Sequence, residues 1–263
     1  MKIAAAQIAC EVGDVAANVR KLVSLAERAK AAGADWVVLP EMSDTGYVMS
    51  VIREKASRWS EGPVVELQRV ARELSLGIIA GVSERTDKCI FNSQVVIGPS
   101  GEALAKYRKA HLFTPCPIEE DKCFSAGGEL VSLGVEGARF GLSICYDLRF
   151  PEFYRALAIN QRANVLIISS AWPFPRVEHL RTLTTARAIE NQSYVILSNR
   201  VGSDGGVTFC GSSAIIDPYG VVLAAASADR EELIHAEVSE QVVRSVREQM
   251  QVLEHRRPEV YGA

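Results

Sequence analysis

Three residues of different chemistry each follow an apolar segment that has the pattern of a buried strand. Glu41 follows residues 36–40, Cys145 follows residues 139–144, and Lys109 comes directly after a third such segment. Ligands of sheets covered by helices bind beyond the carboxyl ends of the strands, so we expect these side chains to converge there. A thiol, a carboxylate and an ammonium group at one place can act as nucleophile, general base and oxyanion donor.

Cys145 has the strongest local signal for reactivity. An apolar strand segment precedes it, and Pro151 marks the first turn of a helix expected over residues 151–159. Such a sharp turn lifts a side chain out of the sheet and directs backbone N–H groups toward it. A buried structural cysteine is the alternative, because free cysteines are among the most buried residue types, and we assign that role to Cys10 and Cys89.

Three segments around these residues resemble the signatures of the nitrilase superfamily of carbon-nitrogen hydrolases. They are LPEMSDTGY at 39–47, YRKAHLF at 107–113 and ICYDLRFPE at 144–152, in the order of the family. Taken singly, Glu41 and Lys109 would fit solvated loop charges, but the ordered segments favour a shared site. The resemblance spans nearly the whole chain, and it implies a Glu-Lys-Cys triad of Glu41, Lys109 and Cys145.

The resemblance also implies hydrolysis of a small amide through an acyl-enzyme. Glu41 would accept the thiol proton of Cys145, and the thiolate would attack the amide carbonyl carbon to form a thioester. Lys109 and the backbone N–H of Tyr146 would stabilise the oxyanion, and one such donor contributes about 3–4 kcal/mol. Water activated by Glu41 would then release the carboxylic acid, with no cofactor or metal expected.

A second glutamate extends this expectation. Glu120 precedes Gly127 by seven residues, which is the spacing of an additional glutamate in many family members, and the adjacent Glu119 leaves the assignment open by one position. The resemblance implies that this glutamate positions the substrate nitrogen or the water. A papain-like mechanism would need a histidine base, but we expect His111 and His179 to have structural roles.

The residues after the cysteine indicate a branch of the superfamily. Together with AWPFPR at 171–176 and TARAIENQ at 185–192, they resemble omega-amidases and deaminated-glutathione amidases. Nitrilases and carbamoylases usually carry other residues after the cysteine. The alternatives are an N-carbamoyl-amide hydrolase, an acyltransferase that uses the same thioester, and a non-catalytic binding protein.

Four aromatic side chains near these segments are candidates for binding the substrate. We expect contributions to the pocket from Tyr47, Phe113, Tyr146 and Trp172. Trp172 would stand beyond a strand end and could wall the acyl pocket, and a core tryptophan is the alternative.

Two arginines are candidates for binding a charged substrate. Arg149 or Arg176 could hold the carboxylate of a small keto acid through bidentate hydrogen bonds. Ion pairing of Arg149 with Asp147 or Glu152 is favoured, however. The acidic loop 114–121 also argues against an anionic substrate, and it keeps a broad aliphatic or aromatic amidase open.

The elements that must position these residues alternate between strands and helices. The first half predicts a helix between Asp14 and Gly33, a helix over 64–74, strands over 2–8, 36–39 and 78–82, and a hairpin of 91–97 with 103–107. The second half predicts helices over 151–159 and 178–191, strands over 139–144, 165–169 and 194–199, and a hairpin of 213–216 with 221–223. Two sheets packed face to face with helices outside fit this order. The resemblance implies the same α/β arrangement, a four-layer α-β-β-α sandwich.

The chain shows no composition shift that would divide it. We therefore expect a single domain over 1–263, with a C-terminal helix over 239–252 and an extended tail from 256. The resemblance implies that two copies pair through helices, as a homodimer or a higher homo-oligomer.

Composition excludes several classes of protein. The 263 residues are 48% hydrophobic, and 29 Lys and Arg against 32 Asp and Glu give a formal charge of -3. This balance gives no electrostatic footprint for nucleic acid or an anionic membrane, and no apolar run approaches the roughly 18 residues of a membrane helix. Six cysteines without CxxC spacing, four scattered histidines and no export signal predict a cytoplasmic protein with free thiols and no metal.

Overall fold

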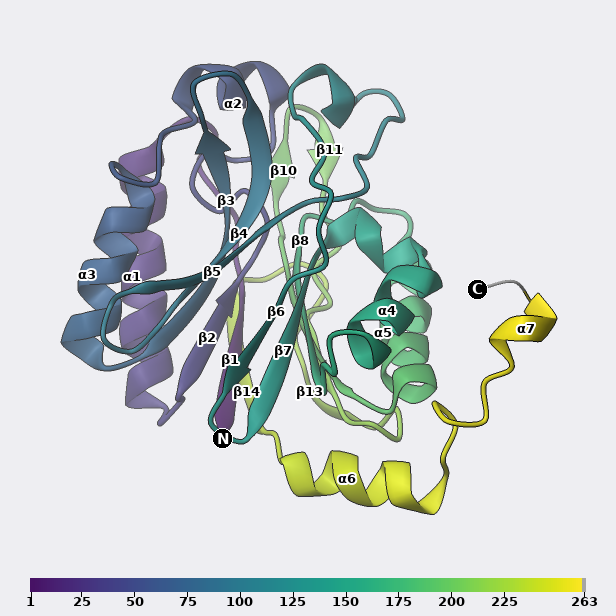
Figure 1. Ribbon diagram of the computed structural model, residues 1–263. Coiled ribbons are helices and arrows are strands. Elements are labelled where there is room, and N and C mark those ends of the chain that lie inside the picture. Colours follow the sequence, from purple (N-terminus) through teal and green to yellow (C-terminus); the bar gives the residue numbers. More distant parts are fainter. Residues whose placement is uncertain (262–263) are drawn as a thin grey trace.

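Two six-stranded sheets lie face to face, and helices cover the outer face of each one (Figure 1). The computed structural model describes residues 1–261. Within that range, α1 (Val15–Ala31) and α3 (Pro63–Leu74) cover the first sheet, and α4 (Pro151–Ile159) and α5 (Val177–Asn191) cover the second. The α/β class and the four-layer α-β-β-α arrangement predicted from the sequence are therefore confirmed.

The first sheet combines the N-terminal half of the chain with one late strand. Its order is β14 (Glu232–Glu237), β1 (Lys2–Gln7), β2 (Trp36–Leu39), β3 (Gly77–Arg85), β4 (Ile90–Ile97) and β5 (Ala103–Arg108). β1, β2 and β3 are parallel, and β4 and β5 continue the sheet as an antiparallel hairpin. The sequence did not predict β14, which pairs antiparallel with β1 and is only partly buried.

The second sheet contains the strand that ends at Cys145. Its order is β13 (Val222–Ala225), β12 (Ala214–Ile216), β9 (Tyr194–Asn199), β8 (Val165–Ser170), β7 (Ala138–Ile144) and β6 (Ser132–Val135). Ser169 Oγ at the end of β8 donates to the carbonyl oxygen of Leu39 at the end of β2, over 2.7 Å. This bond joins the carboxyl ends of strands from the two sheets, so the residues that follow these strands meet.

Shorter elements connect these layers. They are α2 (Met49–Lys55), η1 (Glu120–Lys122), η2 (Cys145–Arg149), β10 (Ser203–Asp204), β11 (Val207–Thr208), α6 (Glu240–Gln249) and α7 (Pro258–Tyr261). The prediction for the C-terminus was partly wrong. The helix expected over 239–252 ends at Gln249, and the tail expected to be extended contains α7, while residues 262 and 263 lie outside the described range.

The main core lies between the two sheets. Trp36 of β2 packs edge-on against Phe140 of β7, with ring centroids 5.1 Å apart, and both rings are buried. β1 contributes only small side chains to the core, and these are the fully buried Ala4, Ala5 and Ala6. Strands that are buried on both faces are apolar throughout instead of alternating, which explains why short apolar runs identified these strands in the sequence.

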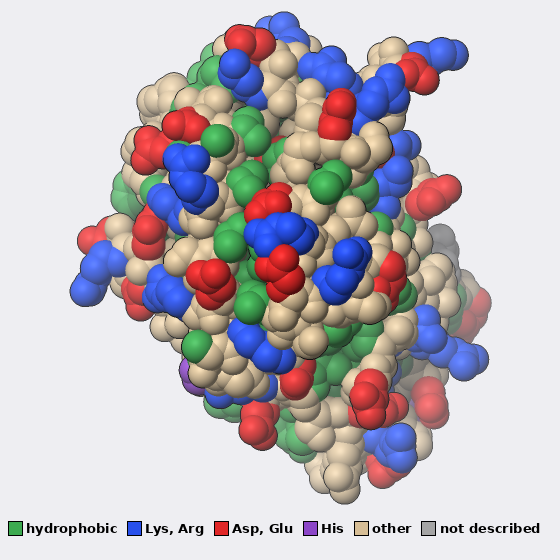
Figure 2. Space-filling view, turned by 90° about the vertical axis from the view of Figure 1, so that its left-hand side faces the viewer, with side chains coloured by type: hydrophobic (Ala, Val, Ile, Leu, Met, Phe, Trp, Pro, Cys, Tyr) green, Lys and Arg blue, Asp and Glu red, His purple; other side chains and the backbone are tan. Residues whose placement is uncertain are grey.

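The outer face over α1 and α3 is a mixed polar surface. Figure 2 shows Lys and Arg side chains interspersed with Asp and Glu on this side of the molecule. On α3, Arg69 pairs with Glu66 and Glu73, which lie one helical turn away on either side. This face therefore carries no block of one sign of charge, in agreement with the balance in the sequence.

Candidate active site

Cys145 stands at the sharp turn that the sequence predicted between β7 and α4. It begins η2 with a φ of 43°, a left-handed conformation that non-glycine residues adopt rarely. Asp147 closes the turn, because its Oδ2 accepts the backbone N–H of Ile144 over 2.9 Å and the hydroxyl of Tyr107 over 2.7 Å. The fold therefore fixes the direction of the Cys145 side chain.

Lys109 and two glutamates form a buried charge cluster next to this turn. Lys109 Nζ lies 2.8 Å from Glu41 Oε1 and 2.8 Å from Glu120 Oε2, and all three side chains are 0% exposed. Glu119, the alternative in the sequence, instead pairs with Lys122 at the surface over 2.5 Å. The structure thus brings Glu120, and not Glu119, to Lys109 and Glu41.

Glu120 accepts hydrogen bonds from four groups. The Tyr47 hydroxyl and Asn92 Nδ2 donate to Oε1 over 2.7 and 2.9 Å, and the Phe113 N–H donates to Oε2 over 2.7 Å. Lys109 is the fourth donor. A carboxylate has about four lone-pair sites, so Glu120 is fully occupied as an anion.

Glu41 is held more loosely. Its Oε1 accepts from Lys109 and Asn92, whereas its Oε2 accepts only the backbone N–H of Ala171, over 2.8 Å. Oε2 therefore keeps an accepting position toward the side where Ala171 and Cys145 line a pocket.

The buried charges shift the pKa values of the reactive groups. Burial raises the pKa of the Cys145 thiol and Glu41 raises it further, although Lys109 opposes them, so the resting group is a thiol. Burial also raises the pKa of Glu41, with Lys109 acting against it. Burial favours neutral Lys109, but the carboxylates of Glu120 and Glu41 outweigh that effect and raise its pKa, so Lys109 is a cation.

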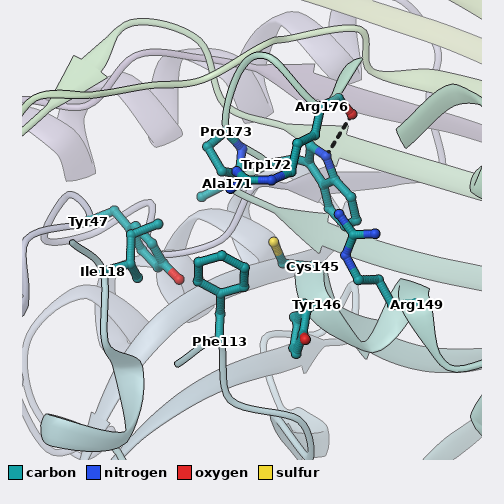
Figure 3. A pocket seen from close by; sticks show the side chains of 10 residues that line it. All are labelled: Tyr47, Phe113, Ile118, Cys145, Tyr146, Arg149, Ala171, Trp172, Pro173 and Arg176. Atoms are coloured by element: carbon teal, nitrogen blue, oxygen red, sulfur yellow. Dashed lines mark hydrogen bonds between the residues drawn. The ribbon is translucent and has the colours of Figure 1, made fainter. Parts of the chain in front are cut away.

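A cleft opens above the Cys145 sulfur (Figure 3). It contains about 290 Å³ of space not filled by atoms, part of which is open to solvent. Figure 3 shows the sulfur between Phe113 and Trp172, with Tyr47 and Ile118 on one side and the arginines on the other. The lining residues are Tyr47, Phe113, Ile118, Cys145, Tyr146, Arg149, Ala171, Trp172, Pro173 and Arg176.

All six residues proposed from the sequence for substrate binding line this cleft. Sequence reasoning missed Ile118 and Pro173, which add apolar surface, and Asn92, which lies beneath the cleft. Asn92 could not have been singled out from the strand segment 91–97, because a buried asparagine has no distinctive spacing in the sequence.

The two arginines, Arg149 and Arg176, lie at the mouth of the cleft. The Arg149 guanidinium stacks 4.7 Å from the centre of the Trp172 ring, and that of Arg176 lies 5.8 Å from the Phe113 ring. The predicted ion pair of Arg149 with Asp147 or Glu152 is wrong, because Asp147 turns inward to close the turn after Cys145. Within residues 1–261, neither arginine forms an ion pair with a carboxylate.

The histidines next to the site have structural contacts. His111 Nδ1 lies 2.8 Å from Asp147 Oδ1, and its ring stacks on Phe150 at 3.7 Å between centroids. His179 is exposed on α5 and does not pack internally, but its Nδ1 lies 3.3 Å from Arg149 Nη2, within hydrogen-bond distance. Residues 1–261 contain no group of three or more His, Cys, Asp or Glu that could hold a metal ion.

Comparison with known proteins gives matches along the chain. The carbon-nitrogen hydrolase family profile matches residues 2–248. A 2-oxoglutaramate amidase of Bacillus subtilis (strain 168) is 36% identical over 261 residues, which cover 98% of each chain. An omega-amidase of Escherichia coli (strain B / BL21-DE3) is 38% identical over 218 residues, which cover 82% of each chain.

Solved structures agree with these matches. A CN-hydrolase superfamily protein of Xanthomonas campestris with an arsenic adduct in its active site has a TM-score of 0.90 at 28% identity, over 98% of this chain and 97% of the other. A variant of the amidase from Nesterenkonia sp. AN1 has a TM-score of 0.88 at 26% identity, over 99% of this chain and 95% of the other. That variant carries the acetamide moiety of fluoroacetamide covalently at its active site cysteine. None of the helices within residues 1–261 of the present chain has the length and apolar character needed to cross a membrane.

Proposed function

The chain belongs to the carbon-nitrogen hydrolases of the nitrilase superfamily and is an amidase of that family, and we propose that Cys145 is its nucleophile. The observation that carries this proposal is the placement of the Cys145 thiol in the cleft beside a buried base and a buried cation. Because burial keeps the thiol protonated at rest, attack on an amide requires a neighbouring base. Glu41 Oε2 is the oxygen with accepting capacity left for that proton.

The acylation step follows from this arrangement. Glu41 Oε2 takes the proton of Cys145, and the sulfur forms a bond to the amide carbonyl carbon. Lys109 has three N–H donors, of which two are bound to carboxylates, so the third is available for the oxyanion together with the N–H of Tyr146. The C–N bond then breaks, and the departing nitrogen receives the proton from Glu41, which leaves an acyl thioester.

In the hydrolysis of the thioester, water takes the place of the thiol as the attacking group and the sulfur becomes the leaving group. Glu41 takes a proton from water, and the oxygen of that water bonds to the acyl carbon. The C–S bond breaks, the carboxylic acid leaves, and the sulfur regains its proton. No group in this cycle changes its oxidation state.

We propose that Glu120 acts through its neighbours instead of touching the substrate. Its carboxylate is occupied by four donors, which leaves it no accepting position for a substrate or a water. It keeps Lys109 charged and fixes the hydroxyl of Tyr47, which is a wall of the cleft. This role differs from the positioning of substrate nitrogen or water that the resemblance implied.

We propose that the substrate is a short amide with a carboxylate at its other end, as in the omega-amidase reaction. Arg149 and Arg176 supply two guanidinium groups without acidic partners above the nucleophile. The acidic loop argues less strongly against such a substrate than its sequence suggested. Glu119 pairs with Lys122, and Glu120 shares Lys109 with Glu41. Two of the relatives reported above are named a 2-oxoglutaramate amidase and an omega-amidase.

The test is ammonia release from a panel of amides by the wild type, Arg149→Met, Arg176→Met and the control Arg181→Met. Arg181 pairs with Glu178 on α5, outside the cleft. We expect the first two substitutions to raise KM for 2-oxoglutaramate about 10- to 100-fold, because each removes a charge-assisted hydrogen bond, and to leave hexanamide hydrolysis nearly unchanged. The control should behave as the wild type.

Other results on the same panel would reassign the substrate. A wild-type preference for hexanamide or benzamide over 2-oxoglutaramate would contradict the carboxylate site and indicate an amidase for neutral amides. Preference for an N-carbamoyl amino acid would indicate a carbamoyl hydrolase, and product formed only with an added amine would indicate acyl transfer.

We also propose that the protein is a cytoplasmic homodimer. The cysteines within residues 1–261 are free, which suits a reducing compartment. Ile189 of α5 is 51% exposed and lies against the turn at Gly220, next to the exposed Val221 and Val222. Sedimentation at micromolar concentration should give twice the monomer mass of 28.6 kDa, and Ile189→Asp should shift the protein toward the monomer. A wild-type monomer would contradict this proposal.

A further inference from the structure

Asn92 of β4 lies where the three charged residues of the site meet. Its Nδ2 is 2.6 Å from Glu41 Oε1 and 2.9 Å from Glu120 Oε1, and its backbone oxygen accepts the N–H of Lys109 over 2.8 Å. The side chain is buried and does not line the cleft. Asn92 is therefore in contact with the charged groups of the site, and its amide nitrogen has no hydrogen left to donate to a substrate.

The amide nitrogen of Asn92 limits where protons can reside. Its two hydrogens are both used, one toward each glutamate, so Glu41 Oε1 and Glu120 Oε1 must both act as acceptors. A proton on either of these oxygens would face an N–H donor. The proton taken up by Glu41 is thus restricted to Oε2, the oxygen toward Ala171 and the cleft.

We propose that Asn92 is a positioning residue, which holds the two glutamates on either side of Lys109 and directs the basic oxygen of Glu41 toward the thiol. This inference rests on the proposed function of Cys145 and Glu41. It assigns no contact with the substrate to Asn92. Loss of the Asn92 amide should therefore lower kcat and leave KM nearly unchanged.

The pH profile of kcat/KM distinguishes positioning from packing, because a loss of packing alone would not shift it. The charged and titratable groups near Glu41 are Lys109, Glu120 and Cys145, and the N–H donors of Asn92 and Ala171 bind its two oxygens. The hydrogen bond from Asn92 lowers the pKa of Glu41 and so opposes the effect of burial. Without it, Glu41 holds its proton to higher pH, and the acidic limb of kcat/KM moves upward.

Gln94 offers a matched control on the same strand. It lies two residues farther along β4 on the same face, is buried, and donates through Nε2 to Ser169 Oγ over 2.8 Å. It touches none of the charged groups of the cluster. Gln94→Ala therefore removes a buried amide from β4 and leaves the charge cluster intact.

The experiment compares the wild type, Asn92→Ala, Asn92→Asp and Gln94→Ala. Two quantities are measured between pH 5 and pH 9. The first is steady-state hydrolysis of the best amide of the panel, and the second is the rate at which fluoroacetamide adds its acetamide moiety to Cys145 with loss of fluoride, followed by intact mass. We expect both Asn92 variants to lose about 10- to 100-fold in kcat with little change in KM, because hydrogen bonds to charged groups are lost. Their acidic limbs should move up by about one pH unit, and Gln94→Ala should retain the wild-type profile.

Asn92→Asp separates positioning from space filling. The substitution keeps the shape of the side chain but replaces the donor with a third carboxylate next to Glu41 and Glu120. If Asn92→Asp resembles the wild type in kcat and pH profile, the hydrogen bonds that Asn92 donates are not needed, and that result would overturn the inference. If Asn92→Ala does not fold, which unfolding in urea would reveal, Asn92→Asp alone tests the inference.

Whether Cys145 is the nucleophile is decided by adduct formation in the wild type alone. If wild-type Cys145 gains no adduct, the proposed nucleophile is wrong, whatever the variants do. If it is modified and the Asn92 variants match Gln94→Ala in rate and pH profile, the positioning role is wrong, and Cys145 remains the proposed nucleophile.

Discussion

Cys145→Ala is expected to abolish amide hydrolysis, with a loss in kcat of at least about 10⁴-fold. Removing the attacking atom of a covalent mechanism costs more than removing any single donor, because the acyl-enzyme can no longer form. The residual rate would come from Lys109 and the N–H of Tyr146, which can still polarise a bound amide. Ammonia release from the best amide of the panel measures the loss, and intact mass after addition of a slow amide or fluoroacetamide reports the missing adduct.

Cys210→Ala is the matched control for this experiment. Cys210 is also buried, but it lies outside the cleft, so its loss removes a core thiol without touching the proposed nucleophile. The control should keep wild-type turnover and still gain one adduct. Turnover by Cys145→Ala, or an adduct on the exposed Cys116, would show that the nucleophile is another residue.

The strands buried on both faces could be predicted from the sequence, whereas the edges of the sheets could not. β2, β7, β8 and β9 appear as short apolar runs because both faces are covered. β6 and β14 are edge strands with mixed burial, so their sequences carry neither a continuous apolar run nor a clean alternation. The positions of β6 and β14 are decided by pairing with another strand, and the local pattern of apolar and polar residues does not predict that pairing.

The convergence of Glu41, Lys109 and Cys145 could be predicted because each follows a strand. The partners that complete the site could not. Asn92 contacts Glu41 across 51 positions of the chain, and Ala171 contacts it across 130 through a backbone N–H that any residue type would provide. Only the assembled sheets bring these donors to one carboxylate.

The wrong prediction for Arg149 has a related cause. A neighbouring acid in sequence suggested an ion pair, but η2 sends successive side chains in different directions. Asp147 points inward to the N–H of Ile144, while Arg149 points out over Trp172. Sequence proximity within a turn therefore did not predict contact, and the correction leaves Arg149 available for a substrate.

Replacing Lys109 by methionine is expected to cost both catalysis and stability. The loss of an oxyanion donor should lower kcat by about 10²- to 10³-fold. The folded protein should also lose about 3–5 kcal/mol, because Glu41 and Glu120 would remain fully buried without their cation. Lys106→Met is the control, because Lys106 lies in β5, the strand that ends just before Lys109. It pairs with Glu84 of β3 with 44% of its side chain exposed, and such pairs contribute little.

The pH dependence of this loss has a definite sign. In the wild type, Lys109 lowers the pKa of Glu41 against the effects of burial and Glu120, so removing the cation raises that pKa further. A carboxyl whose pKa is higher in the folded than in the unfolded state stabilises the fold at low pH, and that contribution is lost as pH rises through the folded pKa. Urea unfolding should therefore show a larger deficit for Lys109→Met at pH 8 than at pH 5. The wild-type lysine, whose pKa is raised, stays charged across this range and adds no slope. A deficit that is equal at both pH values would mean that lost packing, and not two uncompensated carboxylates, causes the instability.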